Sequence, residues 1–138
     1  DPPARSRCGR CSACIDACPT QAIHEHFVVD ARRCLAFHTI ENREDELPEN
    51  IRAALGPWVA GCDICQDVCP WNHRSLPQSN DPDMQPRPWL LNLQKEQIQS
   101  WDDSVWDQNL RGSALRRIKP WMWRRNAAAA QPDPTPTL

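Results

Sequence analysis

Eight cysteines, all in the first half of the chain, carry the clearest chemical signal in the sequence. The pattern Cys-x-x-Cys-x-x-x-Cys-Pro occurs twice in the same register, ending at Pro19 and at Pro70. Cys8 stands three residues before the first copy and completes the ligand run of bacterial ferredoxins. Three thiolates at this spacing in a tight loop can bind corners of one cubane, and the next cysteine reaches a second. The pattern predicts two 4Fe–4S clusters that transfer electrons.

The eight cysteines can be divided between two clusters with none left over. The second copy of the motif lacks an upstream cysteine, because Val59 stands at that position, and Cys34 is the cysteine that neither motif uses. The fourth cysteine of a ferredoxin run ligates the other cluster. We therefore predict two crossed ligand sets: Cys8, Cys11, Cys14 and Cys69 for one cluster, and Cys18, Cys34, Cys62 and Cys65 for the other.

Two other uses of the cysteines are weaker interpretations of the same pattern. A disulfide framework also favours an even number of cysteines, but it does not explain the paired Cys-x-x-x-Cys-Pro endings. Zinc favours Cys-x-x-Cys pairs separated by a longer loop, whereas a third cysteine follows each pair here. The iron–sulfur interpretation accounts for both features.

The composition predicts a small domain with a thin hydrophobic core. The chain has 138 residues, a net charge of −2 and seven tryptophans, and its mean hydropathy is −0.70. Domains of this kind often depend on bound metal for stability. No apolar run approaches the roughly 18–20 residues of a membrane span, so we expect no membrane association. The chain begins at Asp1, close to the first motif, and we expect it to be the downstream piece of a longer protein.

The elements that must position the cysteines predict an α+β fold, with a two-cluster ferredoxin-like core followed by a short all-helical C-terminal region. We expect the cluster domain at 1–75, an extended linker at 76–92, helices at 93–130 and a disordered tail at 131–138. A hairpin is expected to pair 22–23 with 27–29. Proline and glycine positions and apolar spacing predict helices at 48–55, 94–100, 104–110, 113–119 and 121–130.

Tryptophans and charged runs complete the pattern. Trp58 and Trp71 are expected to shield the clusters from water. Four further tryptophans are expected to be core residues that hold the terminal helices together: Trp101, Trp106, Trp121 and Trp123.

Between residues 111 and 125 there are six basic residues and no acidic ones. Such a stripe is an electrostatic footprint for phosphates, although it is more often a solvated helix face. The acidic run at 44–49 indicates a solvated loop.

Three segments together resemble the epoxyqueuosine reductase family. They are Cys34-Leu-Ala-Phe-His-Thr-Ile-Glu41, then Gly61-Cys-Asp-Ile-Cys-Gln-Asp-Val-Cys-Pro-Trp-Asn72, and Gly112-Ser-Ala-Leu-Arg-Arg117 with Arg125-Asn-Ala-Ala after it. The resemblance spans about residues 8–130. Its joint pattern is far more specific than a ferredoxin motif alone.

The resemblance implies a cytoplasmic, monomeric oxidoreductase that reduces epoxyqueuosine to queuosine in tRNA. Members use two 4Fe–4S clusters and a cobalamin held between an N-terminal domain and the cluster domain, and they need an external low-potential electron donor. The acid that supplies the proton is expected in the N-terminal domain. We therefore assign no catalytic residue to this chain and expect it to be inactive alone.

The resemblance also implies two sets of contact residues. Cobalamin is expected next to the second ligand set, at Ala36, Phe37, Gly61, Cys62 and Asp63. A contact of His38 with the corrinoid or the substrate is conceivable. The residues expected at the tRNA are Thr39, Glu41, Arg43, Arg116, Arg117, Lys119, Arg124 and Arg125.

Two competing functions remain open at the level of sequence. The cluster domain of a corrinoid reductive dehalogenase shares the cofactors, but the basic C-terminal helices and the segment 34–41 argue against it. A free-standing two-cluster ferredoxin-like carrier would be small and usually acidic, whereas this chain has a long helical extension with six clustered positive charges. Binding to tRNA with and without epoxyqueuosine would separate these functions.

Overall fold

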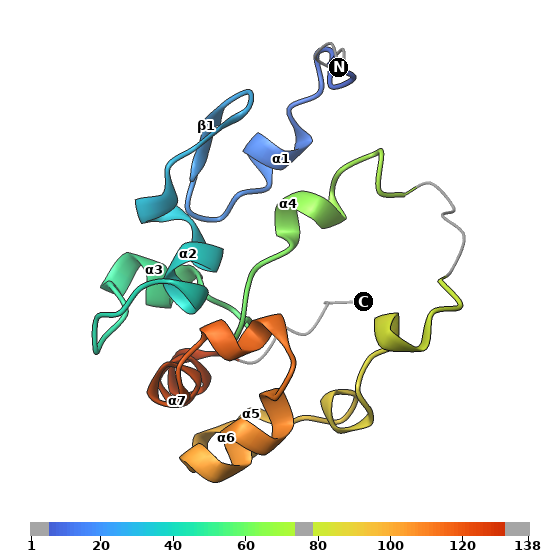
Figure 1. The fold of residues 1–138 in the computed structure, drawn as a ribbon. Helices are drawn as coiled ribbons and strands as arrows, with labels where there is room; N and C mark the ends of the chain where they lie inside the picture. The colour runs from blue at the N-terminus through green and yellow to red at the C-terminus, as the bar shows by residue number, and fades with distance from the viewer. Residues whose placement is uncertain (1–5, 74–78, 132–138) are drawn as a thin grey trace, which may run out of the picture.

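The structure is a computed structural model that describes residues 6–73 and 79–131, and the tail expected at 131–138 lies outside them except for Gln131. A two-stranded sheet is accompanied by short helices, so the α+β class is confirmed. Figure 1 shows the cysteine-rich half, from blue to green, next to the terminal helices, from orange to red, with α7 beside α2 and α3. Among the described residues, no helix is long and apolar enough to cross a membrane.

The two cysteine motifs form the same local structure. Each contains a single helical turn that starts two residues after the first cysteine of the repeat, α1 (Ala13–Asp16) in one copy and α4 (Ile64–Asp67) in the other. The two turns pack against each other. The predicted hairpin is confirmed as β1 (Ile23–Glu25) and β2 (Val28–Val29), an antiparallel pair that also contacts α1.

The segment between the two motifs forms a small scaffold. After the 3₁₀ turn η1 (Ala31–Arg33), α2 (Leu35–Ile40) begins directly at Cys34, and α3 (Glu49–Ala54) confirms the helix expected at 48–55. Gly56, at φ +56°, ends α3 in a conformation that side chains rarely adopt. Helix α2 was not expected from the sequence. One small core lies between these helices and is formed by Leu35, Leu47, Ile51 and Leu55.

The C-terminal region contains the helices that the sequence predicts, with one difference. Helices α5 (Lys95–Gln99), α6 (Asp103–Leu110) and α7 (Pro120–Ala129) confirm the segments expected at 94–100, 104–110 and 121–130. The segment expected as a helix at 113–119 forms only the 3₁₀ helix η4 (Ala114–Arg117). The reason is Pro120, which disfavours a helical conformation at the residue before it, so Lys119 is extended.

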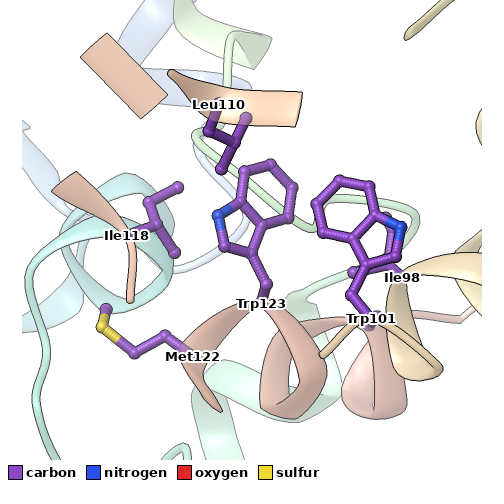
Figure 2. Packing of buried hydrophobic residues seen from close by; sticks show 7 residues of the cluster. Ile98, Trp101, Leu110, Ile118, Met122 and Trp123 are labelled. Atoms are coloured by element: carbon purple, nitrogen blue, oxygen red, sulfur yellow. The ribbon is translucent and has the colours of Figure 1, made fainter. Parts of the chain in front are cut away.

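Tryptophans form the larger hydrophobic core, as expected. Trp101 and Trp123 are buried with ring centroids 5.6 Å apart, and Ile98, Leu110, Ile118 and Met122 surround them (Figure 2). Trp106 and Trp121 pack against this core from its edge.

The segment expected as an extended linker at 76–92 is attached to the same core where the structure describes it. It contains the 3₁₀ turns η2 (Pro82–Met84) and η3 (Pro88–Leu90). Trp89 packs edge-on to Trp101, with ring centroids 5.8 Å apart. Arg87 donates hydrogen bonds to the carbonyls of Asn109, at 2.7 Å, and Arg111, at 2.9 Å. These contacts hold the segment beside α6.

A buried carboxamide joins the two halves of the chain. Asn126 on α7 is fully buried and donates two hydrogen bonds of 2.8 Å, to the carbonyl of Thr39 on α2 and to that of Val59. Its oxygen accepts from the guanidinium of Arg125 at 2.9 Å. An unpaired buried carbonyl is costly, so the amide fixes α7 against both segments that lead to cysteines of the second set.

Replacement of Asn126 by Ala is expected to lower the free energy of unfolding by about 2–4 kcal/mol, because two carbonyls in the interior lose their donors. The measurement is the urea midpoint of anaerobically prepared, cluster-loaded protein, followed by tryptophan fluorescence. Asn92→Ala is the matched control, since Asn92 is exposed. A difference between the two variants below about 0.5 kcal/mol would contradict the assigned role.

Candidate iron–sulfur centres

The first predicted ligand set surrounds one cavity. Cys8, Cys11, Cys14 and Cys69 all line a cavity of about 440 Å³. Its other walls are mostly apolar and come from β1, β2 and the turn after α4; they include Ile23, Phe27, Val28, Val29, Pro70 and Trp71. The expectation that Trp71 lies beside this set is confirmed. The Arg7 guanidinium stacks over its ring, 5.5 Å from the centroid.

Tight turns and short helices in two distant segments position these four thiols at the cavity. Gly9, at φ +56°, allows the tight turn in which the Cys11 amide donates to the Cys8 carbonyl at 2.9 Å. Cys14 lies within α1, and Cys69 follows α4, with its amide donating to the Gln66 carbonyl at 3.2 Å. Because α1 and α4 pack together, the last cysteine of the second motif reaches the cavity of the first.

The second predicted set also lies close together. Burial raises the pKa of the Cys62 thiol, the Ile64 amide lowers it, and the charges of Cys34, Cys65 and Cys18 raise it further. The influence of Cys34, Cys65 and Cys18 on Cys62 agrees with the predicted ligand set. Bound iron would offset the mutual repulsion of these thiolates.

Hydrogen bonds favour the thiolate form of Cys18. Burial raises its pKa, but the amide of Ala22, the hydroxyl of Thr20 and the amide of Ile23 outweigh that effect, so the net pKa is lowered. The Ala22 amide lies 3.2 Å from the sulfur. Amide donors to cluster sulfurs are one of the means by which a protein sets the reduction potential of a cluster.

The donor set fits polynuclear clusters. All eight cysteines are described, and each is a free thiol, so no disulfide framework exists. Within 6–73 and 79–131, no three His, Cys, Asp or Glu side chains are grouped tightly enough to bind a single metal ion. Thiolates of a cubane each bind a different iron and therefore stand farther apart than the ligands of one zinc ion.

The residues expected at cobalamin are brought together by Thr39. Its hydroxyl accepts from the Gly61 amide at 3.0 Å and lies 3.0 Å from the Leu35 carbonyl. This contact holds the start of α2, with Ala36 and Phe37, next to the segment of Gly61, Cys62 and Asp63. Gly61, at φ +80°, has open space where a Cβ would lie. Asp63 is exposed, and the other four residues of this group are half-buried.

Three residues expected to contact a ligand instead form hydrogen bonds within the chain. Thr39 is fully buried. His38 is buried as well, with Nε2 2.7 Å from the Arg32 carbonyl and Nδ1 3.1 Å from the Asn42 amide, so both ring nitrogens have partners. Arg125 donates to the carbonyls of His38, at 2.9 Å, and Asn42, at 3.1 Å. Their positions indicate structural roles, which the sequence did not reveal because most of the partners are backbone groups.

Acids that lie outside its sequence run pair with part of the basic stripe. Asp107 binds Arg111, at 2.6 Å, and also Arg116. Glu41 binds Arg117, whose guanidinium lowers the pKa of the Glu41 carboxyl.

Two other residues expected at the tRNA also form hydrogen bonds with backbone carbonyls of this chain. Arg124 donates to the Trp101 carbonyl at 2.8 Å, and Arg43 donates to the Arg117 carbonyl at 3.3 Å. Lys119 is exposed and forms no ion pair with the described residues. Counting charges along the chain overestimates the free positive charge, because the partners are distant in sequence.

Comparison with known proteins agrees with this architecture. A family model described as a 4Fe-4S double cluster binding domain matches residues 7–72. The epoxyqueuosine reductase of Synechococcus sp. (strain CC9605) is 92% identical over 138 residues, which are 100% of this chain and 43% of that protein.

Solved structures show the same likeness in three dimensions. A structure of epoxyqueuosine reductase from Bacillus subtilis is 29% identical with a TM-score of 0.84, over 94% of this chain and 34% of that one. A crystal structure of epoxyqueuosine reductase with an epoxyqueuosine-modified tRNA-Tyr stem loop is 28% identical with a TM-score of 0.83, over the same shares. The chain thus spans less than half the length of the relatives it matches. In its cysteine pattern, its sequence and its fold, the chain is similar along its length to the portion of epoxyqueuosine reductases that it matches, and residues 7–72 match the double-cluster domain.

Proposed function

We propose that this chain is the electron-transferring portion of an epoxyqueuosine reductase, which reduces epoxyqueuosine to queuosine in tRNA. The observation that carries the proposal is that four free thiols from both motifs line one cavity, while the Thr39–Gly61 hydrogen bond joins the helix after Cys34 to the loop before Cys62. Likeness to epoxyqueuosine reductases along the whole chain supports the same function. We place the protein in the cytoplasm as a monomer, where an external low-potential donor supplies the electrons.

We assign one 4Fe–4S cluster to each crossed ligand set. A bound cluster accepts and releases single electrons, at a potential set by hydrogen bonds to its sulfurs, by charge and by solvent exposure. The residues of this chain supply the groups that set this potential. Apolar side chains of the hairpin and Trp71 line the first site, and the Ala22 amide donates to the Cys18 sulfur in the second.

The crossed ligand sets predict how paired cysteine variants behave. Two cubanes contain about eight irons, so Cys69→Ala should leave about four irons per chain. Adding Cys8→Ala should leave the same number, because both residues belong to one cluster. Adding Cys62→Ala instead should remove both clusters. Iron analysis and electron paramagnetic resonance of anaerobically purified protein measure these outcomes.

Uncrossed ligand sets would reverse the two double variants. If Cys69 shares its cluster with Cys62 and Cys65, the combination of Cys69→Ala and Cys62→Ala keeps about four irons, and the combination with Cys8→Ala loses all of them.

A cobalamin is proposed at the surface formed by the start of α2 and the segment 61–63. The open space beside Gly61 and the half-buried ring of Phe37 suit a large apolar ring system. The group would be shared with the upstream region that the family resemblance implies, and Ala36, Gly61 and Cys62 would bring the second ligand set close to it. A bound cobalamin would supply the cobalt that acts on the epoxide carbon.

The complete protein, with the region upstream of residue 1, is expected to bind about eight irons and one cobalt, and to convert epoxyqueuosine in tRNA to queuosine. The isolated chain, loaded with clusters and given cobalamin, is expected to form no queuosine, because the proton donor lies upstream. Elemental analysis and mass spectrometry of digested tRNA measure both. Iron without cobalt or turnover in the complete protein would indicate a simple electron carrier instead.

Contact with tRNA is proposed at the exposed ends of the basic residues beside η4. The support is the related structure with a modified tRNA stem loop, together with the exposure of Lys119, Arg116 and Arg117. Exposed ion pairs such as Arg117–Glu41 contribute little stability, so phosphates can replace the carboxylates at small cost. We leave Thr39 and Arg125 out of this surface because their polar groups are engaged in contacts within the chain.

Lys119→Gln is expected to weaken binding to modified and unmodified anticodon stem loops equally, because it removes a phosphate contact. The slope of log K against log salt concentration should become shallower by about one. Fluorescence anisotropy across a salt series measures both effects. Arg52→Gln on α3 is the control for loss of one exposed positive charge; if it matches Lys119→Gln, the contact is not localised at η4.

A further inference from the structure

We propose that the tip of the hairpin, beside the first cysteine cavity, docks an acidic iron–sulfur carrier protein that delivers electrons to the first cluster. The inference rests on the proposed function and adds to it the class of donor and the place of electron entry. The docking surface consists of Phe27, Val28 and Val29 at its apolar centre, with Arg7 and Arg10 at its margin.

The hairpin has apolar side chains that no other part of the described chain covers. Phe27 is 75% exposed, Val29 54% and Val28 39%. Phe27 also has φ +67°, a left-handed conformation that is unfavourable for an aromatic residue. Phe27 lines the first cavity, and three quarters of its surface is nevertheless open to solvent in the described chain. An apolar patch of this kind is typical of an interaction site.

The apolar patch is continuous with the wall of the first cavity. Phe27, Val28 and Val29 line that cavity together with the four cysteines of the first set. A protein seated on the hairpin would thus approach the first cluster across a single layer of side chains. Electron transfer depends steeply on distance, so this surface offers a short path.

The first ligand set is also the more accessible of the two. Cys8 and Cys11 are exposed, whereas all four cysteines of the second set are only partly exposed. The second set lies against α2 and the proposed cobalamin surface. An external donor therefore reaches the first cluster, and the second cluster lies between it and the substrate side.

The charges around the cavity favour an acidic partner. No acidic residue is among the described residues that line the cavity, and Arg7 lies over Trp71 at its edge. Arg10, between two ligands of the first cluster, is exposed and forms no ion pair within 6–73 and 79–131. Glu25 is the one acid of the hairpin and does not line the cavity. Opposite charges steer a transient partner into place.

The combination fits a small, transient electron-transfer interface, with an apolar centre that excludes water and a basic margin that guides encounter. In the transfer step, one electron leaves the reduced iron–sulfur centre of the carrier and reduces the first cluster by one. No bond forms or breaks, and the oxidised carrier dissociates.

The test is stopped-flow reduction of the complete, cluster-loaded protein by two donors. One is a reduced acidic plant-type ferredoxin, and the other is the methyl viologen radical cation, which needs no docking surface. Phe27→Asp and Arg10→Glu place negative charge on the proposed surface, and Asp tolerates the left-handed conformation at position 27. Met84→Asp is the control, because Met84 is 71% exposed and lies outside the docking surface.

We expect both surface variants to lower the ferredoxin rate constant about tenfold at low salt, with Arg10→Glu also weakening its salt dependence. Arg10→Glu should keep the viologen rate, iron content and cluster absorbance of the wild type, and Met84→Asp should change nothing. Phe27→Asp also alters the wall of the first cavity, so it is judged by whether its ferredoxin rate falls more than its viologen rate. An unchanged ferredoxin rate in Phe27→Asp, or an equal loss with viologen or in Met84→Asp, overturns the docking surface. If the variants slow reduction by reduced flavodoxin but not by reduced ferredoxin, the partner is not an iron–sulfur carrier. Failure to bind clusters or form queuosine instead overturns the proposed function.

Discussion

The buried hydroxyl of Thr39 is the contact on which the arrangement of the second ligand set depends. It accepts from the Gly61 amide and so joins the helix that follows Cys34 to the loop that precedes Cys62. The backbone carbonyl of the same residue accepts from Asn126, which anchors α7 at that point. A domain with two small hydrophobic cores has little apolar burial to hold distant cysteines in place, so this buried polar link substitutes for it.

The small size of the hydrophobic cores also explains why the basic residues form so many contacts within the chain. Arginines that look like a phosphate-binding stripe in the sequence bind carbonyls and carboxylates across the molecule. Arg125, for example, caps the C-terminal end of α2 through the carbonyls of His38 and Asn42. A guanidinium has five donors in a fixed plane and can satisfy several carbonyls at once, which suits a thin core. The surface that we propose for an RNA backbone is therefore smaller and consists of Lys119 and the exposed ends of Arg116 and Arg117.

The two predicted ligand sets differ in their surroundings, and under the proposed function the difference would give the electron path a direction. The first set lies under an apolar hairpin near solvent, and the second lies against α2 and the Thr39 contact. Because α1 and α4 pack together and exchange their last cysteines, the two sites are neighbours. A donor at the hairpin and an acceptor at α2 would then lie on opposite sides of one short relay.

The sequence by itself determined the ligand chemistry and most of the local structure. Repeated cysteine spacing, proline and glycine positions and apolar periodicity act within a few residues, so the hairpin, α3, α5, α6 and α7 could be predicted. Only the tertiary structure decided which charges are free, because Glu41 pairs with Arg117 and Asp107 with Arg116 across distances that no local pattern encodes. It also decided that Thr39 and His38 are buried supports, and that Phe27 is left exposed beside the first cavity. Those properties depend on how separate elements pack, which the order of residues along the chain does not state.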